Sequence, residues 1–185
     1  MRIDNPEALK KRLLELIRER ALKKGEFVLS SGRKSNYYID GKYITLDPEG
    51  AHLIGMIFLH TYADAEIDAV GGLTLGADPI VGAVVALSNN FSKPLRGFIV
   101  RKEEKGYGSR KFIEGPLFRG DRVIIIEDVI TTGASSHKAI CVAESEGAIV
   151  KGVFCIVDRQ EGGRSFLEEK GYKVSAIFKR DDILY

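Results

Sequence analysis

The sequence contains no tryptophan, only two cysteines and no long run of apolar residues. Two cysteines are too few for a disulfide scaffold, and Cys141 and Cys155 have neither metal-pair nor CxxC spacing, so we interpret both as small apolar residues of a core. Nowhere do about 18 apolar residues follow one another without a charge, and the N-terminal MRIDNPEALKKRLLELI lacks the apolar stretch of a signal peptide. We therefore expect neither export nor a membrane span. We expect the protein to be located in the reducing cytoplasm.

An excess of charge of one sign is also missing. The 28 basic and 26 acidic residues leave a net charge of +2, which is too small to predict a nucleic acid or a membrane surface as a partner. With 44% hydrophobic and 29% charged residues the composition is that of an ordinary globular protein and argues against disorder. A chain of 185 residues suffices for one well-filled core, so we expect a single domain over 1–185.

Apolar segments alternate with amphipathic ones from Pro48 onward. The strand candidates are residues 67–72, 95–100, 122–127, 150–158 and 173–178, and the helical candidates are 48–63, 77–89, 134–146 and 163–171. This alternation predicts an α/β fold with right-handed crossovers and a mainly parallel five-stranded sheet flanked by helices. Ligands of open parallel sheets bind beyond the carboxyl ends of the strands, so the residues after each strand are the candidates for chemistry.

The first 47 residues follow a different pattern. Residues 6–24 are typical of an amphipathic helix, which Asn5 can cap and Gly25 can end. The following FVLSSGRKSNYYIDGKYITLD, residues 27–47, is rich in turn residues and tyrosines and predicts short strands and loops. We therefore divide the domain into an N-terminal appendage, 1–47, and an α/β core, 48–185.

The stretch VIIIEDVITTGASS, residues 123–136, places two adjacent carboxylates, Glu127 and Asp128, after an apolar strand. Their repulsion and desolvation both cost free energy. The small residues behind them precede a helix, whose first N–H groups and dipole favour a phosphate. A plain turn capped by Thr or Ser would explain the small residues alone. The acid pair favours a phosphorylated sugar such as ribose 5-phosphate, because carboxylates accept hydrogen bonds from vicinal hydroxyls and suit a ribose ring that becomes positive.

The run IIIEDVITTGAS resembles the phosphoribosyl-pyrophosphate (PRPP) signature of type I phosphoribosyltransferases. Two further stretches narrow the resemblance: VRKEEKGYGSRKFIEG, residues 100–115, is similar to the mobile catalytic loop of the orotate phosphoribosyltransferase family, and SGRKSNYYID, residues 31–40, to its N-terminal hood. The resemblance covers nearly the whole chain and implies the type I phosphoribosyltransferase fold, with 1–47 as helix and hood. It implies a Mg²⁺-dependent transfer of ribose 5-phosphate from PRPP to orotate, giving orotidine 5′-monophosphate and pyrophosphate in pyrimidine biosynthesis.

The same resemblance implies the residues of the site. PRPP would be bound by basic residues, the two acids and the small-residue turn, namely Arg101, Lys102, Lys105, Tyr107, Glu127, Asp128, Val129, Ile130, Thr131, Thr132, Gly133, Ala134 and Ser135. The catalytic residues among them would be Lys102, Lys105, Tyr107 and Asp128. Orotate would be bound by Thr131 and Arg159, and no side chain is implied as a ligand of the Mg²⁺ cofactor. In the family the basic loop serves a neighbouring subunit, so a homodimer that shares this loop is implied.

Read from its residues alone, the segment RKEEKGYGSRK, 101–111, has five cations against two acids, with glycines at 106 and 108 as flexible points. We interpret it as a lid, because cations and Mg²⁺ must neutralise the charge of a departing pyrophosphate. The alternative is a solvated surface loop. Tyr107 stands where many relatives carry histidine, and its protonated phenol can donate to a phosphate oxygen.

Two other strand ends carry candidates. GGLTLGADP, residues 71–79, is either a pyrophosphate loop that acts through backbone N–H groups and Thr74, with Gly76 where some relatives carry lysine, or a tight strand-to-helix turn. Arg159, in FCIVDRQEGG, either grips the planar carboxylate of orotate with its guanidinium fork or makes a surface ion pair. The hood residues that can close over the base are Ser35, Asn36, Tyr37 and Tyr38.

Three functions fit this pattern. The first is transfer to orotate, in which no residue attacks covalently, because N1 of the base is the nucleophile and the enzyme aligns reactants and stabilises charge. The second is the same transfer to a purine or to uracil. The third is a regulatory module that binds PRPP without turnover, for which a basic patch or helix-turn-helix is missing. We favour the first because three motifs agree with it.

Overall fold

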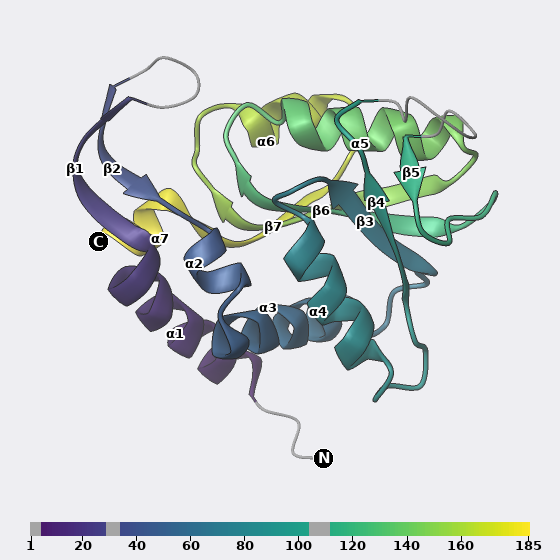
Figure 1. The fold of residues 1–185 in the computed structure, drawn as a ribbon, viewed down its shortest axis with the longest axis horizontal. Helices are drawn as coiled ribbons and strands as arrows, with labels where there is room; N and C mark the ends of the chain where they lie inside the picture. The colour runs from purple at the N-terminus through teal and green to yellow at the C-terminus, as the bar shows by residue number, and fades with distance from the viewer. Residues whose placement is uncertain (1–4, 29–33, 104–111) are drawn as a thin grey trace.

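A twisted sheet runs through the middle of the protein, with helices on both of its faces (Figure 1). The computed structural model describes residues 5–28, 34–103 and 112–185. In these residues the sheet has six strands, in the spatial order β5 (Ile113–Glu114), β4 (Arg96–Val100), β3 (Ala69–Leu73), β6 (Arg122–Ile130), β7 (Ile149–Asp158) and β8 (Val174–Lys179). Adjacent pairs are parallel except β4 and β5. The five expected strands are confirmed as a parallel set, and the two-residue strand β5, which the sequence does not predict, adds an antiparallel edge.

Continuous apolar composition explains why β6 lies inside the sheet. The side chains from Val123 to Ile126 are at most 1% exposed. Ile124 and Ile126 belong to one core cluster, and Val123 and Ile125 belong to the other. Successive side chains of a strand point to opposite faces, so burying the whole run requires a helical layer on each face.

The two helical layers occur where the sequence predicts them. One face is covered by α3 (Pro48–Thr61) and α4 (Asp78–Ser88), with α1 (Pro6–Leu16) beside α3, and the other by α5 (Ala134–Ser145) and α6 (Gly163–Glu169) (Figure 1). The four core helices are confirmed to within two residues at each end. Asp47 begins α3, since its carboxylate accepts hydrogen bonds from the backbone N–H groups of Glu49 and Gly50. None of the described helices is long and apolar enough to cross a bilayer.

The N-terminal helix is shorter than the sequence predicts. Helix α1 continues into a π-helical turn, η1 (Ile17–Ala21), and the chain then enters β1 (Leu22–Val28), which is antiparallel to β2 (Lys34–Ile39). The expected helix over 6–24 is therefore wrong in its last three residues, because pairing with β2 takes over where Leu22 meets Ile39. Gly25 does not end a helix but lies within β1, with a φ of 151°.

Two further short helices are not predicted by the sequence. Helix α2 (Lys42–Thr45) joins the hairpin to α3, and α7 (Arg180–Leu184) follows β8. The guanidinium of Arg18 in η1 donates to the backbone carbonyls of Asp182 and Ile183 at 2.8 and 3.0 Å. These bonds attach the N-terminal helix to the C-terminal one.

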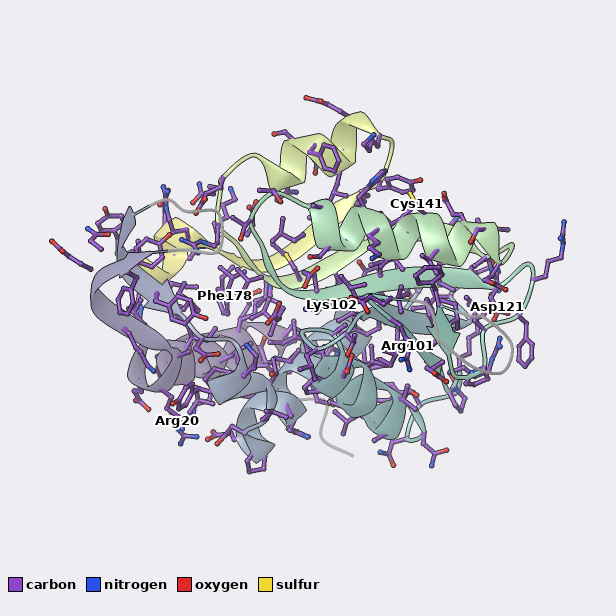
Figure 2. All side chains as sticks on the ribbon, turned by 45° about the horizontal axis from the view of Figure 1, so that its top comes forward. Arg20, Arg101, Lys102, Asp121, Cys141 and Phe178 are labelled. Atoms are coloured by element: carbon purple, nitrogen blue, oxygen red, sulfur yellow. The ribbon has the colours of Figure 1, made fainter. Side chains whose placement is uncertain are left out.

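The two cysteines have different environments. Cys155 is buried in β7, as expected, whereas Cys141 is exposed on α5 (Figure 2). The expectation of a core thiol is wrong for Cys141, because α5 packs against the sheet through Ala139, Ile140 and Ala143 and turns Cys141 away from it.

The loops after β6 and β7 are joined at one edge of the sheet. The backbone N–H of Arg159 donates to the carbonyl of Ile130, and that of Gly163 donates to the carbonyl of Thr131, both at 3.0 Å. A Cβ atom on Gly163 would meet this Thr131 carbonyl at 2.6 Å, so only glycine fits there without a shift. This edge carries the carboxyl ends of the parallel strands, where the sequence places the site.

Candidate functional site

The acid pair at the end of β6 consists of one buried and one more open carboxylate. Glu127 is 7% exposed, and the hydroxyl of Ser136 in α5 donates to it at 3.2 Å. Burial, and then the charge of neighbouring Asp128, raises the pKa of Glu127 to about 8. Near neutral pH Glu127 therefore keeps its proton, so the two adjacent carboxyl groups do not both carry a negative charge.

Replacing Glu127 with glutamine should remove a loss of stability that the protein otherwise shows as the pH rises. Between pH 4.5 and about 8 the unfolded chain releases a proton that the folded chain retains, so the free energy of unfolding falls across this window. Glutamine does not titrate. We therefore expect the free energy of unfolding of Glu127→Gln, relative to that of the wild type, to increase by on the order of 2 to 4 kcal/mol from pH 5 to pH 8. Urea unfolding at both pH values measures this gain, and parallel pH profiles would contradict it.

Asp128 lies where two glycine-containing segments approach the end of β6. A Cβ atom on Gly76, in the loop after β3, would be 2.7 Å from Oδ1 of Asp128, and one on Gly41, before α2, would be 3.3 Å from Oδ2. One carboxylate oxygen also accepts from the N–H of Val129 at 2.8 Å. The absence of side chains at both glycines leaves the carboxylate accessible, so the loop after β3 and the segment that follows the hairpin meet at Asp128.

The turn between β6 and α5 exposes a helix N-terminus. The cap residue is Gly133, with a φ of 78°, and it offers no side chain to the first N–H groups of α5. Thr132 Oγ1 lies 3.4 Å from the N–H of Ala134, at the limit of a hydrogen bond. The cap residue is thus glycine, while the Thr132 hydroxyl makes one long hydrogen bond of the kind that a plain capped turn would contain. Thr132, Ala134 and Ser135 are exposed, as a phosphate cradle requires.

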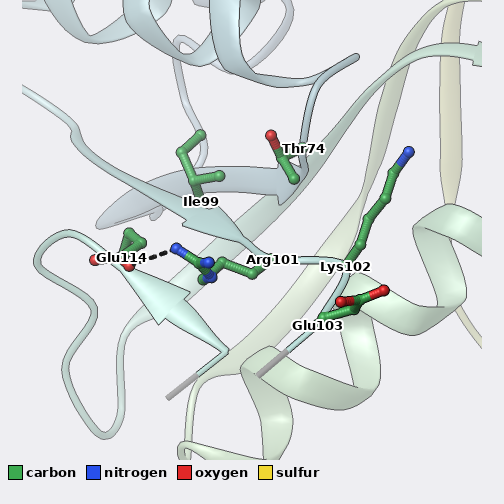
Figure 3. Close-up of a pocket in the computed structure, with 6 residues that line it drawn as sticks. All are labelled: Thr74, Ile99, Arg101, Lys102, Glu103 and Glu114. Atoms are coloured by element: carbon green, nitrogen blue, oxygen red, sulfur yellow. Dashed lines mark hydrogen bonds and ion pairs between the residues drawn. The ribbon is translucent and has the colours of Figure 1, made fainter. Parts of the chain in front are cut away.

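Arg101 and Lys102 follow β4 and line a cavity of about 540 Å³ together with Thr74, Ile99, Glu103 and Glu114 (Figure 3). The guanidinium of Arg101 forms an ion pair with Glu114 at 3.2 Å, and the side chain of Lys102 extends away from it (Figure 3). The backbone carbonyl of Lys102 accepts from Nζ of Lys138 at 2.5 Å, which fixes the start of the basic segment on α5. Lys105 and Tyr107 lie outside the described residues.

The turn after β3 contains an acid, Asp78, whose position in the sequence predicts only that it lies near the start of a helix. Thr74 donates its hydroxyl to Asp78 Oδ2 at 2.7 Å, across the turn into α4. The other oxygen, Oδ1, is buried without a hydrogen-bond partner in the described part of the chain. Thr74 thus lines the cavity with its orientation held by Asp78.

Arg159 is buried at the end of β7, with 7% exposure, so the alternative of a surface ion pair is wrong. Its guanidinium lies 5.2 Å from the ring centroid of Tyr37, and Nη2 donates to the Tyr37 hydroxyl at 3.4 Å. Nε is 3.0 Å from Glu161 Oε1, an ion pair without hydrogen-bond alignment. Tyr37 comes from β2, so the structure brings the hood and the strand end together around one cation.

The other hood candidates are placed differently. Tyr38 packs against Phe27, with ring centroids 5.7 Å apart, and Asn36 is exposed. The side chain of Ser35 lies outside the description. Val129, Ile130 and Thr131 complete the end of β6 and the turn, and Ile130 is buried in the core cluster beneath α5. Sequence reasoning missed Gly41, Ser136 and Glu161, each of which contacts a candidate residue.

Several curated and solved proteins are similar to this chain, although no protein-family model matches it. An orotate phosphoribosyltransferase of Aquifex aeolicus is 46% identical over 178 residues, which cover 95% of this chain and 97% of the relative. The crystal structure of the Mycobacterium tuberculosis H37Rv orotate phosphoribosyltransferase with Fe(III) dicitrate superposes with a TM-score of 0.85 at 35% identity, over 96% of this chain and 99% of the other. The complex of the same mycobacterial enzyme with PRPP gives a TM-score of 0.80 at 34% identity, over 95% and 98%.

Proposed function

The chain belongs to the orotate phosphoribosyltransferase family, and from that premise we propose that it transfers ribose 5-phosphate from PRPP to N1 of orotate. The products are orotidine 5′-monophosphate and pyrophosphate, in the synthesis of pyrimidine nucleotides. The observation that carries the proposal is the joined edge of the sheet. There the loops after β6 and β7 hold an acid pair, an open helix N-terminus and a buried arginine close to one another.

The turn Thr131–Ser135 would bind the 5-phosphate of PRPP. Its exposed N–H groups at the start of α5 and the hydroxyls of Thr132 and Ser135 are donors that a phosphate can accept from. Asp128 would accept hydrogen bonds from the ribose hydroxyls, and the adjoining backbone of Val129 and Ile130 would border the sugar. Negative charge at this acid pair would also stabilise a ribose ring that becomes positive as the bond to pyrophosphate stretches.

The cations after β4 would bind the pyrophosphate end. Arg101 and Lys102 line the cavity beside Thr74, and Lys105 and Tyr107 follow them in the sequence. We assign catalytic roles to Lys102, Lys105 and Tyr107 as donors to the leaving group, and to Asp128 as the stabilising charge. No covalent nucleophile is needed, because the ring nitrogen of the base attacks C1 of the sugar.

Orotate would be held by Arg159 and Thr131. Arg159 is a buried cation in contact with an aromatic ring and one acid, and a planar carboxylate complements its guanidinium fork. Thr131 belongs to the turn whose carbonyl accepts from Gly163, four residues after Arg159. The base would thus be bound next to the sugar that it attacks.

Mg²⁺ is the proposed cofactor. The described residues contain no cluster of three or more His, Cys, Asp or Glu side chains, so the protein alone offers no cage. This donor set suits a magnesium ion that takes most of its ligands from substrate phosphates and water, with Asp128 as the more open acid available to it. The bound ion would neutralise charge on the departing pyrophosphate.

We further propose a homodimer in which the basic segment reaches the partner's site, as the family resemblance implies. Lys138 supports this segment at its start, through the Lys102 carbonyl. Location in the cytoplasm stays a prediction from the sequence.

A spectrophotometric assay of orotate consumption tests the proposed activity. Orotate absorbance should fall only when PRPP and Mg²⁺ are both present, and chelation with EDTA should stop the reaction. No loss of orotate under these conditions would contradict the proposal. Product formation with adenine or uracil instead would support the alternative base, and tight PRPP binding without product from any base would support a regulatory module.

A further inference from the structure

A second cavity lies at the opposite edge of the sheet from Asp128 and Arg159. Its volume is about 450 Å³, in the range of pockets that bind small molecules. It opens where β6, β7 and β8 begin and α3 ends, and its polar lining includes Arg122, Lys151, Lys173 and Ser175. The proposed reaction uses none of these residues.

A β-bulge directs one of the lysines toward this cavity. In the pairing of β6 with β7, Val123 is opposite Val150 and Ile124 is opposite Gly152, so Lys151 is an extra residue without a partner in the register. Bulges of this kind turn a side chain out of the regular alternation. Lys151 is exposed at the mouth of the cavity rather than fixed against the neighbouring strand.

A close backbone approach brings the second lysine to the same place. The carbonyl of Lys173 accepts from the N–H of Val153 at 2.9 Å. A Cβ atom on Gly152 would meet this carbonyl at 2.8 Å, so a side chain at position 152 would push the two segments apart. Glycine at this position thus allows Lys151 and Lys173 to line one cavity.

The charges around the cavity leave the two lysines available to a ligand. Arg122 is occupied, because its guanidinium forms two hydrogen bonds with Asp68, at 2.9 and 3.1 Å, and another with Glu66. Within the described residues Lys151 and Lys173 form no ion pair. The three cations around the cavity thus outnumber the two acids, Glu66 and Asp68. Both acids are paired with Arg122, so the excess positive charge lies on Lys151 and Lys173.

The rest of the lining suits an organic ligand with an apolar part better than it suits an inorganic ion. Ala65, Ile67 and Ile124 form an apolar wall. Tyr62 and Ser175 add two hydroxyl groups to the lining, and burial raises the pKa of the Tyr62 phenol, so this group stays protonated and can donate. An anionic group at the lysines with a compact ring against the isoleucines would match both parts.

We propose that this cavity is a second binding site, which takes a small organic phosphate monoester of nucleoside-monophosphate size through Lys151 and Lys173. The phosphate is bound by the two ammonium groups, and the ring lies against Ile67 and Ile124. The site is separate from the PRPP site, which occupies the carboxyl ends of the same strands.

An NMR titration of the ¹⁵N-labelled full-length protein with adenosine 5′-monophosphate tests the proposal, because it distinguishes the two sites. The amide signals of Gly152 and Ser175 report the second cavity, and those of Gly133 and Ala134 report the phosphate turn. We expect saturable shifts of the Gly152 and Ser175 signals. Shifts confined to Gly133 and Ala134 would overturn the proposal.

Charge-removing variants identify the residues that bind. Lys151→Met/Lys173→Met keeps both aliphatic stems and should weaken binding at Gly152 by at least about 10-fold, with the shifts at Gly133 unchanged. The control Lys93→Met/Lys170→Met removes the same charge elsewhere and should bind like the wild type. Equal weakening by both pairs would overturn the assignment to these lysines.

Inorganic phosphate tests the contribution of the ring. In a parallel titration it should bind at least about 10-fold more weakly at Gly152, since it lacks the ring. Equal affinity of phosphate and adenosine 5′-monophosphate would overturn the proposed contact with the ring.

Discussion

Replacing Arg159 with alanine should lower kcat/KM for orotate by about 30- to 5,000-fold, because removing one partner of a buried charge interaction costs about 2 to 5 kcal/mol. The buried guanidinium is the cation at this strand end that we assign to the orotate carboxylate, and it lies against Tyr37 and Glu161. Arg159→Lys should restore only part of the activity, since an ammonium keeps the charge but loses the planar fork. Initial rates at varied orotate and saturating PRPP give the measurement.

Arg164→Ala is the matched control for this prediction. Arg164 lies five residues further along, is 38% exposed in its side chain and pairs with Glu168 one helical turn away. Its loss should change kcat/KM for orotate by less than about 3-fold. If Arg159→Ala were no worse than Arg164→Ala, or if it abolished PRPP binding instead of orotate use, the assignment of Arg159 to the base would be wrong.

Replacing Asp128 with asparagine should lower kcat by about 100- to 1,000-fold, the range found when one preorganised electrostatic group is removed from a reacting centre. Asparagine has the same shape, so the space between Gly41 and Gly76 and the bond from the Val129 N–H can be kept while the charge is lost. Glu127 is protonated near neutral pH, so it supplies no negative charge of its own there. Stopped-flow and steady-state rates at pH 7 measure the effect.

The comparison with Glu127→Gln makes this prediction specific. At pH 7 the glutamine of that variant resembles the protonated Glu127 of the wild type. The kcat of Glu127→Gln should therefore be at least about 10-fold higher than that of Asp128→Asn. Thermal unfolding of both variants shows that the fold is kept. An equal loss in the two variants, or a larger loss for Glu127→Gln, would contradict the division of charge within the pair.

The core of the fold follows from local sequence features. Strands such as Val123–Ile126 are apolar throughout, which predicts burial on both faces, and Asp47 with Pro48 marks the start of α3. The end of the N-terminal helix could not be predicted in this way. Its pattern continues past Ala21, but the pairing of Leu22 with Ile39 depends on a strand 17 residues later, and such non-local pairing overrides helix propensity.

The site shows the same division between local and non-local information. The acid pair and the phosphate turn occur in one short stretch, so the sequence places them together. The contact of Tyr37 with Arg159 joins residues 122 positions apart, and the approach of Gly41 to Asp128 also depends on how the hood folds. Glu161 was within reach of sequence reasoning, since an acid two residues after a buried arginine is a natural partner for its charge.

The bond between Gly163 and Thr131 means that the loops after β6 and β7, to which we assign substrate binding, do not move independently. A ligand that orders the phosphate turn also limits the freedom of the chain that follows Arg159, so part of the entropy cost of ordering the second loop is met by the first ligand. Thermodynamic linkage then makes the effect mutual: the factor by which the sugar diphosphate strengthens binding of the pyrimidine equals the factor by which the pyrimidine strengthens binding of the sugar diphosphate. If the two loops bind the substrates as we propose, we expect positive cooperativity between the substrates within one subunit, as a consequence of a single glycine that permits two backbones to touch.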